Sequence, residues 1–113
     1  MRIRRSTDLL QDDDIRLIAK ASDAFSHPLR LKIFQFIMTQ NAQLKPVCNK
    51  DLVEEFGYAQ STISQHMGIL VRSGLIQLEK KNKYSYYFVH TGNYNTYINA
   101  MTKFIQLKAN VLR

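Results

Sequence analysis

Residues 60–72 have the sequence QSTISQHMGILVR and the periodicity of an amphipathic helix. At about 100° per residue, Ile63, Met67 and Leu70 fall on one face, and Gly74 follows where a left-handed residue would end the helix. The other face has hydroxyl, amide and guanidinium groups and no acidic side chain, which suits base edges and phosphates of DNA. A generic solvated face would carry Glu and Lys, so we interpret this segment as a helix that reads DNA. The residues of the proposed reading face are Ser61, Ser64, Gln65, Gly68 and Arg72.

The segments on either side of this helix predict a winged helix-turn-helix. A short helix over about residues 50–56, with Asn49 as its cap, precedes it and ends at Gly57. Two β-rich runs follow it, at 75–79 and 84–89. The four residues between them form a turn in which Asn82 tolerates a positive φ. Two short helices followed by a two-stranded ribbon are typical of the winged motif.

The remaining helices complete a mainly α fold with a β-hairpin wing, in the order α-α-α-α-β-β-α. Apolar periodicity predicts helices over residues 12–25, 28 to about 40, and 93 to about 112, with a polar loop at 41–46. The length of 113 residues fits one domain.

The positive charge of the chain is unevenly distributed. Residues 1–25 contain five basic and five acidic side chains, so the net charge of +7 comes from the rest of the chain. A basic domain suits a polyanion such as nucleic acid. Lys80, Lys81 and Lys83 at the hairpin turn can reach phosphates, although charged hairpin tips also serve solubility alone.

An apolar stripe along the last helix is too extensive for a helix appended to a small domain. We therefore expect a homodimer in which the last helix and the first helix (about residues 10–25) contact a partner subunit. Two reading helices would then meet DNA half-sites about 34 Å apart. The residues expected at this interface are Leu17, Ala21, Tyr94, Tyr97, Ile98, Met101, Phe104 and Ile105.

The stretches AFSHPLRLKIF and DLVEEFGYAQSTISQHMGILVRSGLIQLEKKNKYSYYFV closely resemble the ArsR/SmtB-like repressors of bacteria. The shared motifs are H-P-x-R at 27–30, Q-S-T-x-S-x-H at 60–66, and the S-G-L-I that precedes the wing. The resemblance implies a dimeric DNA-binding repressor whose first and last helices form the interface, and it places Gln60, Ser61, Ser64, Gln65 and His66 toward DNA. The helical angle of His66 leaves packing and a phosphate contact equally open.

The chain departs from the family pattern at the helix cap and at the metal sites. Ala59 stands where members often have a capping Ser or Thr. Members often sense metals through a Cys-x-Cys pair; here Cys48 matches the first cysteine, but the second is replaced by Lys50, whose ammonium cannot act as a soft metal ligand. The family's other site needs Asp, His and Glu on the last helix, and residues 91–113 contain none of them. We expect no metal and no cofactor.

Cys48 is the only cysteine, so no intrachain disulfide is possible. It is either a partly buried small residue or a thiol activated by the helix start and Lys50, which could oxidise or pair across a dimer. The second interpretation would make the protein a redox-responsive regulator.

Two other functional classes would require different sequence features. A winged-helix module that binds proteins rather than DNA would expose apolar anchors on the 60–72 helix, where only Ile69 comes near doing so. We do not expect an enzyme, because no paired carboxylates lie in an apolar context and the sequence has no Ser-His-Asp or Cys-His spacing and no glycine-rich phosphate loop. No apolar run spans a membrane and residues 1–14 do not resemble a signal peptide, so we expect a cytoplasmic protein. The operator, the regulated genes and any small-molecule effector are not encoded in these patterns.

Overall fold

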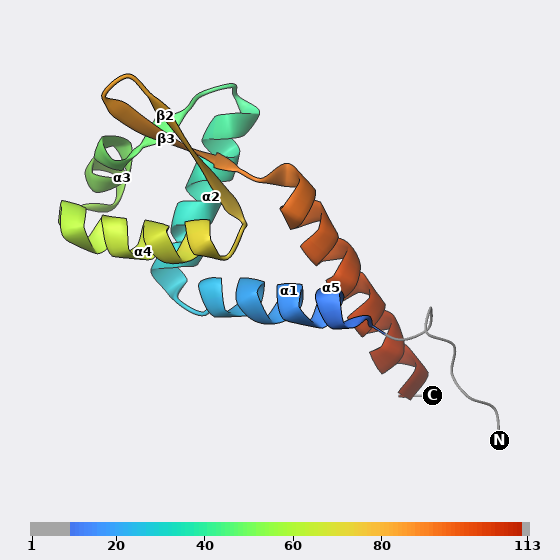
Figure 1. Ribbon diagram of the computed structural model, residues 1–113. Coiled ribbons are helices and arrows are strands. Elements are labelled where there is room, and N and C mark those ends of the chain that lie inside the picture. The colour runs from blue at the N-terminus through green and yellow to red at the C-terminus, as the bar shows by residue number, and fades with distance from the viewer. Residues whose placement is uncertain (1–9, 112–113) are drawn as a thin grey trace.

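A computed structural model describes residues 10–111 and confirms the mainly helical winged helix-turn-helix (Figure 1). The helix that was predicted to read DNA is α4. The elements are α1 (Asp12–Ala24), α2 (Pro28–Ala42), β1 (Val47–Cys48), α3 (Asn49–Phe56), α4 (Gln60–Arg72), β2 (Ile76–Lys81), β3 (Tyr84–Val89) and α5 (Thr91–Val111).

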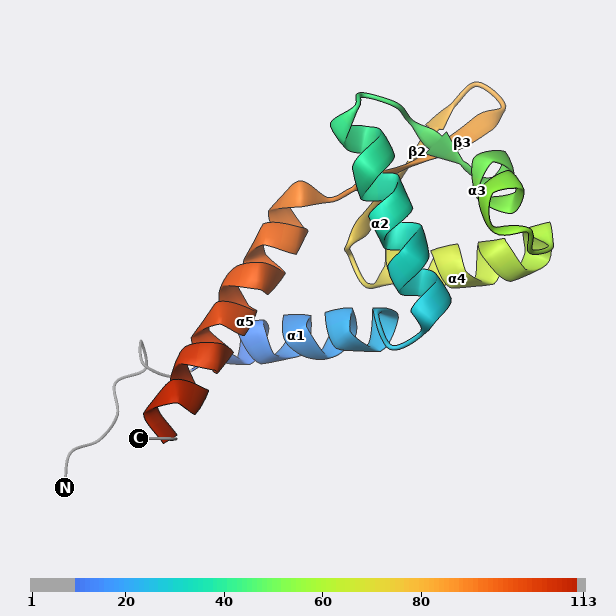
Figure 2. The ribbon, with the colours of Figure 1, turned by 180° about the vertical axis from the view of Figure 1, so that it is seen from behind.

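The core lies where α2, α3 and α4 meet the hairpin, and α2 runs through its middle (Figure 2). Ile63, Met67 and Leu70 of α4 are at most 1% exposed, which confirms the predicted inward face of this helix. Fully buried Ile33 and Ile37 of α2 also belong to this core cluster. Burial of such side chains contributes about 1.5–3 kcal/mol each, so packing rather than propensity fixes the position of α4.

The two ends of α4 differ in how they are capped. Ala59 occupies the N-cap and gives no side-chain hydrogen bond, as its sequence predicts. At the other end, the Ser73 hydroxyl donates to the Leu70 carbonyl and accepts from the Leu75 amide, and Gly74 adopts a φ of 84°. Because the start of α4 has no side-chain cap, its position depends on the packing of the buried face of the helix.

The sheet has three antiparallel strands in the order β1-β3-β2, and β1 was not predicted. Val47 and Cys48 pair with Tyr87 and Tyr86 of β3. Two residues are too few to give a strand periodicity, and the preceding helix α2 also runs two residues beyond its predicted end. The polar loop predicted at 41–46 is shortened accordingly.

The hairpin turn is tighter than predicted. Strand β2 continues to Lys81, which pairs with Tyr84, so the turn consists of Asn82 and Lys83 instead of four residues. Asn82 adopts a φ of 60°, as expected for a residue that tolerates the left-handed region. The wing is consequently a longer paired ribbon than the sequence indicated.

Helices α1 and α5 cross and lie beside the winged body, with α5 extending away from it (Figures 1 and 2). Tyr94 and Tyr97 anchor the start of α5: the Tyr94 ring lies 5.2 Å from that of Phe34, and the Tyr97 ring lies 5.9 Å from that of Phe25, measured between centroids. Within residues 10–111, no helix combines the length and apolar character needed to cross a bilayer.

Candidate nucleic-acid interface

Five of the predicted DNA-facing side chains lie on the solvent face of α4. Gln60, Ser61, Ser64, Gln65 and Arg72 are all exposed, while the opposite face is buried. The helix carries no acidic residue, so nothing on it repels phosphate. The structure thus presents hydroxyl, amide and guanidinium groups together on one free surface.

Gly68 is covered by the side chain of Arg72. A Cβ atom added to Gly68 would lie 3.1 Å from Nη1 of Arg72. DNA can therefore approach the backbone at Gly68 only after this flexible guanidinium swings away. The Arg72 side chain lies exposed on the reading face, a position compatible with the phosphate contact predicted for it.

His66 lies at the packed edge of α4 and not on the reading face. Its Nδ1 lies 3.1 Å from Nη1 of Arg30, and its ring packs against His27 with centroids 4.7 Å apart. Because a guanidinium can only donate, Nδ1 must be the acceptor. These contacts favour the packing interpretation of His66 over a phosphate contact.

Arg30 is a buried structural residue to which the sequence assigned no role. Its guanidinium donates to the carbonyls of Ala24 at 2.7 Å and Asp23 at 3.3 Å, and only 8% of the residue is exposed. These carbonyls end α1, where a cation offsets the negative end of the helix dipole. Arg30 therefore joins the end of α1 to α2 and, through His66, to α4. The H-P-x-R motif at 27–30 was the available signal.

The cluster of His27, Arg30 and His66 predicts that stability falls in acid. Burial, followed by His27 and Arg30, lowers the pKa of His66 below its ordinary value of 6.5. Above pH 6.5 both the folded and the unfolded chain hold this imidazole neutral. As the pH falls below 6.5, the unfolded chain takes up a proton that the folded chain resists, so stability is lost until the lowered folded pKa is passed.

When the pH is lowered from about 7.5 to about 5.5, we expect the urea midpoint of the wild type to decrease. The decrease should be smaller in His66→Gln, which keeps an acceptor for Arg30. Circular dichroism at both pH values measures this. Equal losses in the two proteins would show that His66 does not carry the effect.

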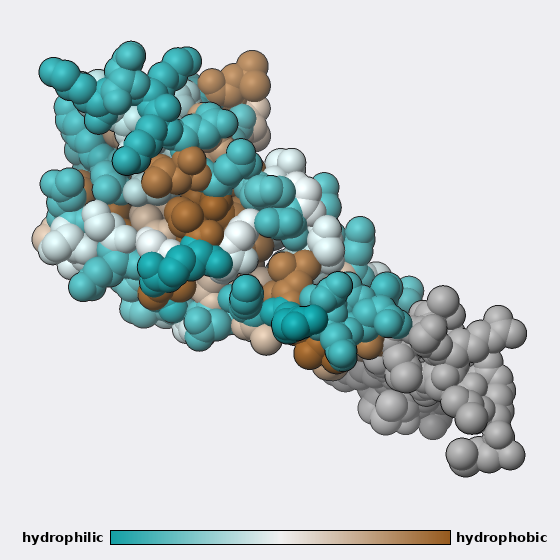
Figure 3. All heavy atoms as spheres, in the orientation of Figure 1, coloured by the Kyte–Doolittle hydropathy of each residue, from teal (hydrophilic) through white to brown (hydrophobic). Residues whose placement is uncertain are grey.

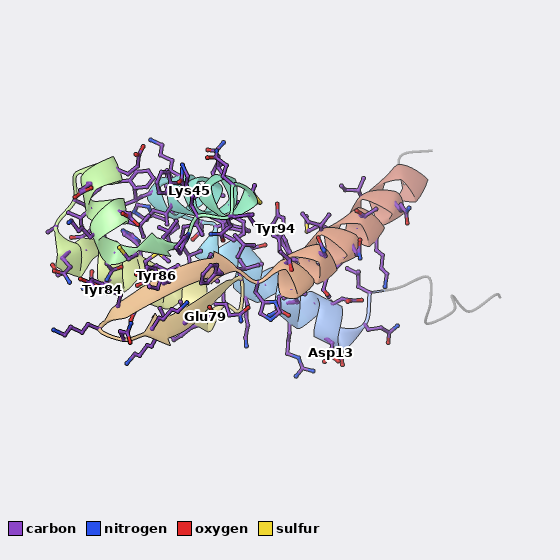
Figure 4. The ribbon with its side chains drawn as sticks, turned by 90° about the horizontal axis from the view of Figure 1, so that it is seen from above. Asp13, Lys45, Glu79, Tyr84, Tyr86 and Tyr94 are labelled. Carbon is purple, nitrogen blue, oxygen red and sulfur yellow. The ribbon has the colours of Figure 1, made fainter. Side chains whose placement is uncertain are left out.

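The hairpin carries the three predicted lysines, all exposed, and its end is covered by hydrophilic residues (Figure 3). Alternation along β2 places Lys80 on the face of Ile76, which packs into the core, and Lys81 on the outer face. The outer face also carries Tyr84, Tyr86 and Glu79, of which Glu79 pairs with Tyr86 (Figure 4). The two lysines therefore point to opposite sides, and Lys80 shares the side that faces the body.

Cys48, rather than Asn49, occupies the N-cap of α3. The Cys48 amide donates to Oδ2 of Asp51 at 3.0 Å, and its thiol donates to the same oxygen at 3.4 Å. A carboxylate does not stabilise a thiolate as the expected Lys50 ammonium would, and Lys50 itself is exposed. This geometry favours the structural interpretation of the half-buried cysteine.

Among residues 10–111, no group of three or more His, Cys, Asp or Glu side chains is placed to hold a metal ion.

The expected interface residues divide into two groups. Ala21 is fully buried within the single chain, and Tyr94 and Tyr97 pack against its core, so these three residues stabilise the fold of the chain itself. Ala21 therefore cannot make the partner contact predicted for it. By contrast, Ile98, Phe104 and Ile105 of α5 are 42%, 50% and 63% exposed. Ile15 of α1 is 50% exposed. Leu17 and Met101 are half-buried.

The exposed face of α4 offers no large apolar anchor for a protein partner. Ile69, the nearest candidate, is half-buried and packs against the core. The surface of this helix is thus chemically suited to a polar, negatively charged ligand.

Comparison with known proteins assigns the family. The sequence profile of the family described as "Bacterial regulatory protein, arsR family" matches residues 27–77, which run from the start of α2 into β2. The HTH-type transcriptional regulator YbzH of Bacillus subtilis (strain 168) is 34% identical over 74 residues, covering 57% of this chain and 74% of YbzH. The chain belongs to the ArsR family. It is therefore a DNA-binding transcriptional regulator with a helix-turn-helix.

Solved structures of similar fold support the architecture of this ArsR-family chain. An ArsR-like transcriptional regulator from Rhodococcus sp. RHA1 superposes with a TM-score of 0.75 at 15% identity, covering 88% of this chain and 90% of that one. The transcriptional repressor BigR from Xylella fastidiosa gives a TM-score of 0.58 at 20% identity, covering 82% and 92%. At these identities the likeness concerns the fold alone.

Proposed function

We propose that the chain is a single-domain, homodimeric transcriptional repressor that binds a two-fold symmetric operator. In this proposal α4 enters the major groove, and the wing lies along the flanking backbone. The observation that carries it is the outer face of α4, where Gln60, Ser61, Ser64, Gln65 and Arg72 are all exposed to solvent and no carboxylate is present. The repressor role follows from the resemblance of the motifs at 27–30 and 60–66 to ArsR/SmtB-like repressors.

The dimer in this proposal forms through α1 and α5. Exposed Ile98, Phe104 and Ile105 make α5 too apolar to remain solvated along its outer side. The contact between Lys103 of α5 and Asp14 of α1, at 3.4 Å, helps to hold the two helices as one surface. A two-fold axis through this surface would present two copies of α4 to successive major grooves.

The proposed repressor lacks the usual metal switches of its family. Lys50 replaces the second cysteine of the first site, and residues 91–113 contain no Asp, Glu, His or Cys for the second. Any effector would therefore have to act through other residues.

Two substitutions on different elements test the division between reading and positioning. We expect Gln65→Ala to reduce affinity for the selected operator by about tenfold or more while leaving binding to unrelated DNA almost unchanged, because an amide reads base edges. We expect Lys80→Ala to weaken binding to both DNAs alike. The slope of log affinity against log salt concentration should become shallower by about one, the value of one phosphate contact. Fluorescence anisotropy with both DNAs at several salt concentrations measures this. If Gln65→Ala leaves the preference between the two DNAs intact, α4 is not the reading helix.

A further inference from the structure

A chain of hydrogen bonds links the wing to the reading face. The Tyr87 hydroxyl on β3 donates to Oδ1 of Asn49 at 2.8 Å, and Nδ2 of Asn49 donates to Oγ of Ser64 at 3.2 Å. Asn49 opens α3, and Ser64 is exposed on α4. Three elements of the winged motif therefore converge on one hydroxyl that faces solvent.

The direction of this chain is fixed from its buried end. Tyr87 is only 6% exposed, and burial raises its pKa above the ordinary value of 10.0, so the phenol keeps its proton. A buried phenol hydrogen needs an acceptor, and within residues 10–111 Asn49 is the only hydrogen-bond partner of this hydroxyl, so the hydrogen goes to Oδ1 of Asn49 and the amide nitrogen is directed at Ser64. An amide nitrogen only donates, so the Ser64 oxygen must accept. The hydroxyl hydrogen of Ser64 then remains free to point outward.

We propose that Asn49 is a specificity-determining positioning residue that makes Ser64 a hydrogen-bond donor toward a base in the major groove. The inference rests on the proposed function, in which α4 lies in that groove. A donor in this position favours the keto edges, O6 of guanine and O4 of thymine, over the amino edges of cytosine and adenine.

Ser61 provides an internal comparison on the same helix face. Its side chain is also exposed, but within the described part of the chain no side-chain partner holds its hydroxyl. The Ser61 hydroxyl can therefore rotate to donate or to accept. Of these two hydroxyls, the one on Ser64 alone is held by a neighbouring side chain as a donor toward solvent.

The test is selection of bound sequences from random double-stranded DNA by the full-length protein and its variants. Comparison of wild type with Ser64→Ala identifies the base position that Ser64 reads. In Asn49→Asp the carboxylate can only accept, so it takes the hydrogens of both Tyr87 and Ser64 and leaves the Ser64 lone pairs facing DNA. We expect the preference at this position to move from guanine or thymine toward adenine or cytosine by about three- to tenfold, the value of one hydrogen bond.

Tyr87→Phe provides a second, gentler variant. It keeps the buried ring but frees the Asn49 amide to turn over, so we expect the keto preference at the Ser64 position to weaken without reversing.

Asn95→Asp, at an exposed position on α5, controls for the negative charge added by Asn49→Asp, and it should leave the base preference unaltered. An acidic residue in the first turn of α3 is favourable to the helix dipole, and thermal melts confirm that each variant is folded.

The outcomes separate the two levels of the proposal. If Asn49→Asp and Tyr87→Phe select the same base at the Ser64 position as wild type, the role of Asn49 is wrong and the DNA-binding function stands. If Ser64→Ala changes no base preference, Ser64 reads no base and the inference is also overturned. Failure of the wild type to enrich any sequence would refute the proposed function and this inference with it.

Discussion

Replacing Arg30 by methionine lowers the free energy of unfolding by about 3 kcal/mol, a large part of the 5–15 kcal/mol typical of a whole domain. The methionine fills much of the space but leaves the carbonyls of Asp23 and Ala24 and the ring of His66 without their donor. Each orphaned buried acceptor costs about 1–3 kcal/mol, part of which water recovers at this protein edge. Urea unfolding followed by circular dichroism measures the loss.

Lys32→Met is the matched control for this substitution. It removes one positive charge from an exposed position of the same helix, so the free energy of unfolding should change by no more than about 0.5 kcal/mol. A loss below about 1 kcal/mol in Arg30→Met would mean that the guanidinium does not hold α1 against α2 and α4.

The double substitution Ile98→Glu and Phe104→Glu converts the proposed dimer to a monomer and weakens operator binding by at least about a hundredfold. Two carboxylates in an apolar interface lose their hydration without gaining partners, and a monomer forfeits the second half-site. Since both side chains are exposed in the protomer, the fold itself should persist. Light scattering after size exclusion gives the oligomeric state, and anisotropy gives the affinity.

The control for this pair is Gln35→Glu with Gln43→Glu. Both glutamines are exposed and lie outside α1 and α5, and the change in net charge is the same. We expect this variant to remain dimeric, with affinity lowered only by the added charge. A dimer that survives Ile98→Glu and Phe104→Glu would show that α5 is not the main subunit contact.

The parts of the structure that were predictable from sequence are those with a periodic signal. The inward face of α4, its uncapped start at Ala59 and its end near Gly74 all follow from the spacing of apolar residues and from glycine chemistry. The four long helices were likewise evident from their periodicity, and the β-rich runs located the hairpin, although β2 continues two residues beyond its predicted end.

The features that were missed depend on contacts between residues distant in sequence. Strand β1 exists because Val47 meets Tyr87, and two residues carry no periodicity of their own. Asn49 was predicted as the cap of α3, but it is the first residue of that helix and its amide bonds to Tyr87 and Ser64, while Cys48 is the N-cap. The role of Arg30 is set by carbonyls at the end of α1, which only the fold brings within reach.

Selection from random DNA by the wild-type protein tests most directly whether two copies of α4 read an operator. We predict one enriched site with two inverted half-sites centred about 34 Å apart, bound with an affinity that falls steeply as salt increases. We also predict that Gln65→Ala alters the enriched bases in both half-sites. An unenriched pool, or the same site selected by wild type and Gln65→Ala, would contradict the assignment of residues 60–72 as the DNA-reading helix.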